Sequence, residues 1–269
     1  MTTRDVTLHY RLDGDPARQP LLAFVNSLGT DFRIWDDVAK HLRRHFAVLL
    51  HDTRGHGLSS IGETPYTIET LAADLGELAD HVGARRLIVC GISVGGQVAI
   101  SLANLRPDLV SALILCDTAP RIGDEMSWNM RIAAIEAGGI EAVADPIVTR
   151  WFAPGYVARH PEEFAGYRAM LVRQPRQGYI ATCAALRESD LTETVREITV
   201  PTLCLVGEHD ASTPRHLVEA MAKLISGAEF RAIPAAGHLP PIERPEALAE
   251  IVRTFASRIA MESLSHVAH

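Results

Sequence analysis

Short, uninterrupted runs of apolar residues recur along the chain and predict a buried sheet. Five of these runs are Leu21–Val25, Phe46–Leu50, Leu87–Cys90, Leu113–Cys116 and Thr202–Val206. A run without alternation is typical of a strand buried on both faces, as in a parallel sheet covered by helices. Val6–Leu12 instead alternates polar and apolar residues, which predicts a half-exposed strand. We therefore expect an α/β fold with a mostly parallel central sheet.

Several stretches between these runs show the periodicity of a helix. In Ile68–Val82 the apolar residues fall three and four positions apart, the spacing of one helix face. Gly95–Asn104 directly follows the apolar run Leu87–Cys90 and its glycine-rich turn. Pro245–Ile259 begins with a proline, which favours the first turn of a helix, and a strand-like Phe230–Ile233 precedes it.

The segment from Ala119 to Ser189 has a different character. It is rich in aromatic residues, has no buried-strand run, and is divided by glycines and prolines such as Gly138-Gly139 and Pro161. We expect a helical cap, residues 119–189, inserted between two strands of a core formed by residues 1–118 and 190–269. A chain of 269 residues accommodates one large α/β domain with such an insertion.

Composition and charge narrow the possible functions. With 47% hydrophobic and 22% charged residues, the chain cannot be extensively disordered. A net charge of −7 argues against nucleic acid or an anionic membrane as a partner, so a small anionic substrate would need a local cation. No apolar run reaches about 18 residues, and we expect neither a membrane span nor a secretion signal.

The cysteines carry no sign of a disulfide framework or a metal site. Cys90, Cys116, Cys183 and Cys204 form no C-x-x-C pair, and three of them lie in apolar strand-like runs. We expect buried free thiols, hence a cytoplasmic protein, and nothing in the sequence indicates a metal or organic cofactor.

A G-x-S-x-G pattern, Gly91–Gly95, follows the apolar run Leu87–Cys90 and precedes a predicted helix. On such a turn a serine is held in a strained backbone conformation, with its hydroxyl above the sheet and near the helix N-terminus. The pattern alone also fits an ordinary turn with a capping serine. Its place between strand and helix favours Ser93 as a nucleophile.

A serine hydroxyl needs a base to take its proton, and His238 occupies a suitable place for that base. It lies in the loop between the last predicted strand and the last predicted helix. Asp210, just beyond the run Thr202–Val206, is the acid expected to orient the imidazole, with Asp117 and Glu208 as rivals. The chain order Ser93, Asp210, His238 is that of α/β-hydrolases.

Two backbone N–H groups are needed to stabilise an oxyanion during acyl transfer. We expect one from Val94, directly after the nucleophile, and one from Leu28, in the loop after the run Leu21–Val25. The segment Asp52–Gly57 also holds ionisable residues. We interpret it as a structural turn that braces the nucleophile loop, with Arg54 as a hydrogen-bonding fork.

Two groups of motifs, one before the insertion and one in it, carry a resemblance to a known family. They are Asn26–Asp31 with Trp35, Asp52–Gly57, Asp117–Ala119 with Arg121–Gly123, Trp128-Asn129, Arg131-Ile132, Arg150–Phe152, Gln177–Tyr179 and Cys183–Ala185. On these motifs the chain resembles the 3-oxoadipate enol-lactonases of bacterial aromatic catabolism, within the α/β-hydrolase superfamily, over essentially its full length. Most members of that superfamily have His-Gly where Asn26-Ser27 stands here.

The resemblance implies hydrolysis of a five-membered enol-lactone with an acetate arm, giving 3-oxoadipate in the β-ketoadipate pathway. Attack on the lactone carbonyl would produce an oxyanion and release a resonance-stabilised enolate that His238 can protonate. Water activated by His238 would then hydrolyse the acyl-Ser93. A single-step route, in which His238 activates water against the lactone, stays open.

An acetate arm needs a cation, which a bidentate arginine in the insertion would supply. We expect Arg131 to bind the carboxylate and Trp128 to form an apolar wall over the ring. The alternative is that Arg131 is a solvated helix residue and Trp128 belongs to the core of the insertion.

Other functions on the same scaffold stay open. A carboxylesterase, a C–C bond hydrolase of ring-cleavage products or a perhydrolase would share the triad, because the pocket rather than the fold determines the substrate. A haloalkane dehalogenase or epoxide hydrolase is disfavoured, since those need a carboxylate where Ser93 stands. A non-catalytic ligand receptor would not need the triad, and a nucleotide-binding enzyme would need a phosphate loop that this chain lacks.

Overall fold

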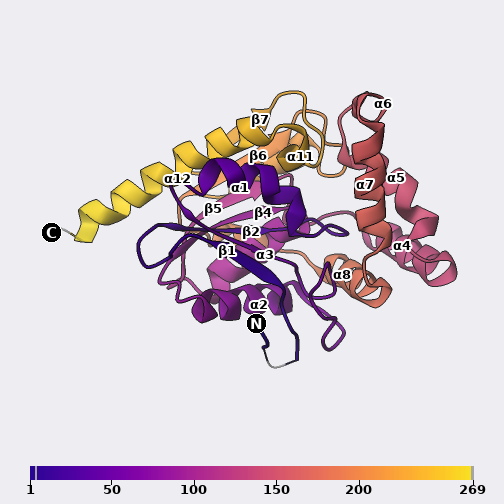
Figure 1. Ribbon diagram of the computed structural model, residues 1–269, viewed down its shortest axis with the longest axis horizontal. Coiled ribbons are helices and arrows are strands. Elements are labelled where there is room, and N and C mark those ends of the chain that lie inside the picture. The colour runs from indigo at the N-terminus through magenta and orange to yellow at the C-terminus, as the bar shows by residue number, and fades with distance from the viewer. Residues whose placement is uncertain (4, 268–269) are drawn as a thin grey trace.

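A seven-stranded sheet forms the centre of the molecule (Figure 1). The computed structural model describes residues 1–3 and 5–267, with side chains as far as residue 261. The strands are β1 (Tyr10–Asp13), β2 (Leu21–Val25), β3 (Ala47–His51), β4 (Leu87–Ile92), β5 (Val110–Cys116), β6 (Thr202–Gly207) and β7 (Glu229–Ile233). Their order across the sheet is β1-β3-β2-β4-β5-β6-β7, and only β1 runs antiparallel to its neighbour. The predicted mostly parallel sheet is confirmed.

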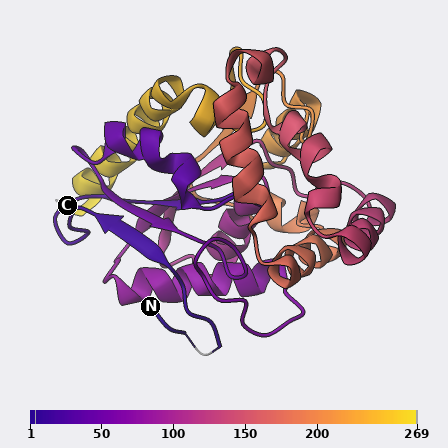
Figure 2. The same cartoon turned by 45° about the vertical axis from the view of Figure 1, so that its right-hand side comes forward.

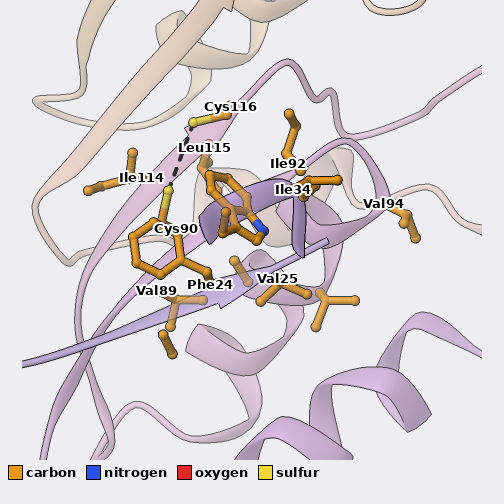
Figure 3. Close-up of a cluster of buried hydrophobic side chains, with 14 of the residues drawn as sticks. Phe24, Val25, Ile34, Val89, Cys90, Ile92, Val94, Ile114, Leu115 and Cys116 are labelled. Carbon is orange, nitrogen blue, oxygen red and sulfur yellow. Dashed lines mark hydrogen bonds between the residues drawn. The ribbon is translucent and has the colours of Figure 1, made fainter. Parts of the chain in front are cut away.

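The central strands are buried on both faces, which explains their uninterrupted apolar sequences. Phe24 of β2 pairs with Cys90 of β4, which pairs with Ile114 of β5, and all three side chains are fully buried. Figure 3 shows these residues in one cluster with Cys116, whose Sγ lies 4.0 Å from that of Cys90. All four cysteines are free and buried, as predicted.

Helices cover both faces of the sheet. One face carries α1 (Asp36–Leu42) and α12 (Pro245–Val267), and the other carries α2 (Ile68–His81) and α3 (Val94–Leu105) (Figure 1). A 3-10 helix, η1 (Phe32–Trp35), precedes α1, and α10 (Arg215–Leu224) contacts β6 and β7. None of the described helices is long and apolar enough to cross a membrane.

A helical cap lies beyond one end of the sheet, where it forms a separate layer (Figures 1 and 2). Its helices are α4 (Glu125–Gly138), α5 (Glu141–Trp151), α6 (Tyr156–Arg159), α7 (Pro161–Val172) and α8 (Arg176–Glu188). The short helix α9 (Thr192–Arg196), which ends the insertion, contacts α3 and α10 of the core. The predicted helical insertion therefore exists and connects β5 to β6. Its last helix lies beyond residue 189, and the division into core and cap at residues 118 and 190 stays a prediction.

The first strand is shorter than the alternation in Val6–Leu12 predicts. β1 begins only at Tyr10, because the preceding residues hydrogen bond to a loop instead of a strand. The N–H of His9, for example, donates to Oγ of Ser59 at 2.9 Å. Leu8 is nevertheless buried, so the alternating pattern reports the burial of this segment rather than its pairing.

Candidate active site

Ser93 lies at the sharp turn between β4 and α3. Its φ of 57° falls in the left-handed region, which residues with a side chain rarely adopt. A Cβ added to Gly91 would lie 2.0 Å from the carbonyl oxygen of Gly95, and one added to Gly95 would lie 2.4 Å from that of Val25. Close backbone contacts therefore require both glycines of the G-x-S-x-G pattern, and they hold the serine at the carboxyl end of the sheet.

His238 and Asp210 form a buried hydrogen-bonded pair. They follow β7 and β6 respectively, and His238 Nδ1 lies 2.9 Å from Asp210 Oδ2. Asp210 also accepts hydrogen bonds from the hydroxyl of Thr213 (2.6 Å) and the backbone N–H of Ser212 (2.7 Å). Burial raises the pKa of Asp210, but the neighbouring His238 and these hydrogen bonds outweigh burial and lower the pKa below its ordinary value. An ionised Asp210 can hold the Nδ1–H tautomer, which leaves His238 Nε2 free to act as a base.

The two rival acids do not hydrogen bond to His238. Asp117 is fully buried, with Oδ1 accepting from the N–H of Gly207 at 2.7 Å and Oδ2 without a partner among the described residues. Burial, and then the nearby Asp210, raise the pKa of Asp117 well above its ordinary value. Glu208 is largely exposed and accepts from the N–H of Ala235 instead.

A possible metal-ligand cluster coincides with this acid–base group. Asp117, Asp210 and His238 offer ligand atoms within 4.8 Å of one another. Asp210 and His238 already hydrogen bond to each other, and the raised pKa of Asp117 favours its neutral form. We therefore interpret the cluster as an acid–histidine pair with a second, neutral acid beside it.

Ser93 and His238 line the same cavity of about 160 Å³, between the carboxyl end of the sheet and the cap. No hydrogen bond joins Ser93 Oγ to the imidazole of His238 in the described part of the chain. Such catalytic contacts are often long without substrate and tighten when it binds. The cavity therefore brings nucleophile and base to one place, and their chemical roles stay predictions.

The loop expected to supply an oxyanion donor is held by Asn26. Its Nδ2 donates to the carbonyl oxygen of His51 (2.8 Å), and its Oδ1 accepts from the indole N–H of Trp35 (3.0 Å). Leu28 from this loop lines the cavity. Val94 is the first residue of α3, so its N–H has no intrahelical partner. Both N–H groups can serve a ligand, and their oxyanion role stays a prediction.

Arg131 and Trp128, the predicted substrate-binding residues, both line the cavity. The guanidinium carbon of Arg131 lies 4.8 Å from the centre of the Trp128 ring, a cation–π contact. The indole N–H of Trp128 donates to the carbonyl oxygen of Ile122 at 2.7 Å, and the side chain is buried. Trp128 is thus both part of the core of the cap and a wall of the cavity.

Two further cavity residues, Arg150 and Tyr179, were not expected at the site, although both lie in motifs that carry the resemblance. The hydroxyl of Tyr179 is buried without a hydrogen-bond partner among the described residues, and burial raises its pKa, so it remains a proton donor. Ile147, Arg150 and Trp151 fall at helical spacing on α5 and all line the cavity, a periodicity that could have revealed Arg150. The lining includes two arginines and neither aspartate nor glutamate, which favours an anionic ligand.

Arg54 lies away from the cavity, in agreement with a structural interpretation of Asp52–Gly57. Its buried guanidinium binds both carboxylate oxygens of Asp74 on α2, each at 2.6 Å, and contacts Asp5 at 3.0 Å. The fork is therefore present, but it ties the turn to α2 and the N-terminal segment rather than to the nucleophile loop.

Comparisons with known proteins agree with this architecture. A model of the alpha/beta hydrolase family matches residues 22–251. Among curated relatives, 3-oxoadipate enol-lactonase 2 of Acinetobacter baylyi is 31% identical over 96% of both chains, and 3-oxoadipate enol-lactonase 1 of the same organism is 32% identical over 94% of both.

Solved structures that resemble this chain also include an enol-lactonase. The enol-lactonase from Burkholderia xenovorans LB400 has a TM-score of 0.90 and 36% identity, covering 93% of this chain and 96% of that one. A thermophilic esterase from Thermogutta terrifontis with malate bound has a TM-score of 0.89 and 30% identity, covering 94% of each chain. The resemblance found in the motifs is confirmed, and the chain belongs to the alpha/beta hydrolase family as a homologue of the 3-oxoadipate enol-lactonases.

Proposed function

We propose that this protein is a serine hydrolase that opens 3-oxoadipate enol-lactone to 3-oxoadipate. The observation that carries the proposal is a single cavity lined by Ser93, His238, Arg131 and Arg150 and by no acid. It offers a nucleophile and base on one side and positive charge on the other. A small lactone with one carboxylate arm matches both sides, and the enol-lactonase relatives support that substrate.

The chemistry begins with the Asp210–His238 pair. Asp210 accepts the Nδ1–H of His238, and His238 Nε2 takes the proton of Ser93 Oγ as that oxygen attacks the lactone carbonyl carbon. The carbonyl oxygen becomes an oxyanion near the N–H groups of Leu28 and Val94. Loss of one such donor removes about 2.7–4 kcal/mol of transition-state stabilisation in other serine hydrolases.

Collapse of the oxyanion breaks the ring C–O bond and leaves an acyl-Ser93. The ring oxygen departs as an enolate and takes the proton from His238, and the enol becomes the 3-oxo group. Water then loses a proton to His238 as it attacks the acyl carbon, and Ser93 leaves with that proton. The direct route, with water activated against the lactone itself, would use the same base and the same oxyanion donors.

The acetate arm is assigned to the cap side of the cavity. Arg131 supplies charge and a planar donor fork, Trp128 supplies an apolar face for the ring, and Arg150 and the hydroxyl of Tyr179 add further donors. One relative, the Thermogutta terrifontis esterase, has malate bound, so a small carboxylic acid is a ligand of at least one protein of this kind. Four free thiols agree with the reducing cytoplasm as the site of the reaction.

A short-chain carboxylesterase is the second candidate, favoured by that same esterase relative. The test is the ultraviolet absorbance of the enol-lactone, with Ser93→Ala as the control. We expect rapid loss of the lactone with the native protein, none above background with Ser93→Ala, and slower turnover of p-nitrophenyl acetate and a vinylogous diketone. Preference for the neutral ester over the lactone would contradict the proposal in favour of the carboxylesterase.

A further inference from the structure

Glu243 connects the cap to the loop that carries His238. It is the last residue of the one-turn helix α11 (Pro240–Glu243). Its Oε1 accepts a hydrogen bond from the N–H of Ala153 in the cap at 2.8 Å, and its Oε2 accepts one from the N–H of Gly237 at 2.5 Å. We call these two hydrogen bonds the Glu243 clamp.

The two segments joined by the clamp lie in direct backbone contact. A Cβ on Gly237 would lie 2.6 Å from the nitrogen of Ala153 and 2.9 Å from the carbonyl oxygen of Trp151. That carbonyl oxygen also accepts a hydrogen bond from the N–H of Leu239 at 3.1 Å. Residues 151–153 of the cap therefore pair with the chain on both sides of His238.

The two clamped segments both carry residues that line the cavity. Arg150 and Trp151, just before Ala153, line it from the cap, and His238, next to Gly237, lines it from the core. Among the described residues Glu243 forms no ion pair, and its carboxylate oxygens accept hydrogen bonds from backbone N–H groups. Each of the two N–H groups faces a different carboxylate oxygen, so both oxygens of Glu243 are used.

We propose that Glu243 is a positioning residue that fixes the cap wall at Arg150 and Trp151 relative to His238, and thereby the fit of a substrate that reaches the cap. The inference rests on the proposed function, because it requires a substrate with an arm on the cap side. Glu243→Gln keeps the shape but offers one acceptor, so either Ala153 or Gly237 is left facing an amide NH₂. Glu243→Ala removes both acceptors.

The kinetic test compares the enol-lactone, which reaches the cap, with p-nitrophenyl acetate, which is neutral and short. We expect Glu243→Gln to lower kcat/KM for the lactone about tenfold, mainly through KM, and Glu243→Ala to lower it further. Both variants should retain at least half of the activity on p-nitrophenyl acetate. Glu246→Gln, at an exposed glutamate in the first turn of α12, is the matched control and should change neither substrate. Equal losses on both substrates, or an unchanged lactone reaction, would overturn the proposal.

A second measurement separates this inference from the proposed function. If the native protein hydrolyses p-nitrophenyl acetate but not the lactone, the proposed function fails, and hydrogen exchange then tests the clamp. The amides of Ala153 and Gly237 should exchange at least about tenfold faster in Glu243→Gln than in Glu246→Gln, at an unchanged midpoint of thermal unfolding. Unchanged exchange at these amides would show that Glu243 does not hold the two segments together.

Discussion

Replacement of Asp210 by asparagine should remove most of the activity by reversing the tautomer of His238. The backbone N–H groups of Ser212 and Thr213 lie 2.7 and 3.2 Å from Asp210 Oδ1. Because these donors belong to the backbone, the amide oxygen of an asparagine must take that position. Its NH₂ group then takes the place of Oδ2, 2.9 Å from His238 Nδ1, and donates to it. The imidazole proton moves to Nε2, which can no longer accept a proton from Ser93.

The expected loss is about 10⁴-fold in kcat, the size of the effect of a wrong tautomer in a serine protease triad. At about 1.36 kcal/mol for each factor of ten, this corresponds to about 5.5 kcal/mol of transition-state stabilisation. KM should change little, because Asp210 lies behind His238 and does not line the cavity.

Initial rates with the lactone and with p-nitrophenyl acetate measure this loss for two substrates with different leaving groups. Glu208→Gln is the matched control, since Glu208 is a nearby acid without a hydrogen bond to His238, and we expect less than a twofold change. A folded Asp210→Asn protein that keeps more than a tenth of the native kcat would refute the tautomer argument. It would also remove Asp210 from the proposed triad.

Three other changes test separate parts of the structure. Burial raises the pKa of Asp117 in the folded protein, so the stability that its protonated form contributes is lost as pH rises from the ordinary carboxyl pKa of about 3.9 toward the raised value. The advantage of Asp117→Asn over the native protein in thermal unfolding should therefore grow from pH 5 to pH 7, and an equal advantage at both pH values would contradict this. Arg131→Lys should raise KM for the lactone more than it lowers kcat, and an unchanged KM in steady-state kinetics would remove Arg131 from the site. Gly91→Ala should destabilise the fold by about 3 kcal/mol or more, because the added Cβ would lie 2.0 Å from a backbone oxygen. Gly166→Ala, in open space on α7, should instead stabilise the fold by about 0.5–1 kcal/mol. Chemical denaturation measures both changes, and a stable Gly91→Ala protein would exclude the tight turn at Ser93.

The buried strands and the Ser93 turn could be predicted from the sequence because their requirements are local. A strand covered on both faces needs an unbroken apolar run, and the turn at Ser93 needs glycine at two fixed positions beside it. The pairing of Asp210 with His238 was predicted from the place of each residue after a strand-like run and from the chain order Ser93, Asp210, His238. The strands and the turn depend on few neighbours, so a short stretch of sequence is enough to indicate them.

The cap side of the cavity could not be predicted in the same way. The spacing of Ile147, Arg150 and Trp151 places them on one face of α5, but whether that face lines a cavity depends on how α5 lies over the core. The same holds for Tyr179, whose hydroxyl has no partner within its own helix. Nothing in the local sequence distinguishes Glu243 from an ordinary helix residue, and its two hydrogen-bond donors lie 90 and 6 positions away along the chain. Long-range packing decides all three.

The path of the chain into and out of the cap has a consequence for how this scaffold can change. The insertion leaves the sheet after β5 and returns at β6, and these two strands are hydrogen-bonded neighbours. A segment whose two ends meet at adjacent strands can be exchanged for one of another length without altering the register of the sheet. A graft of a different cap should therefore yield a new substrate preference on the same proposed triad, provided that the graft presents a backbone N–H to Glu243 where Ala153 does now.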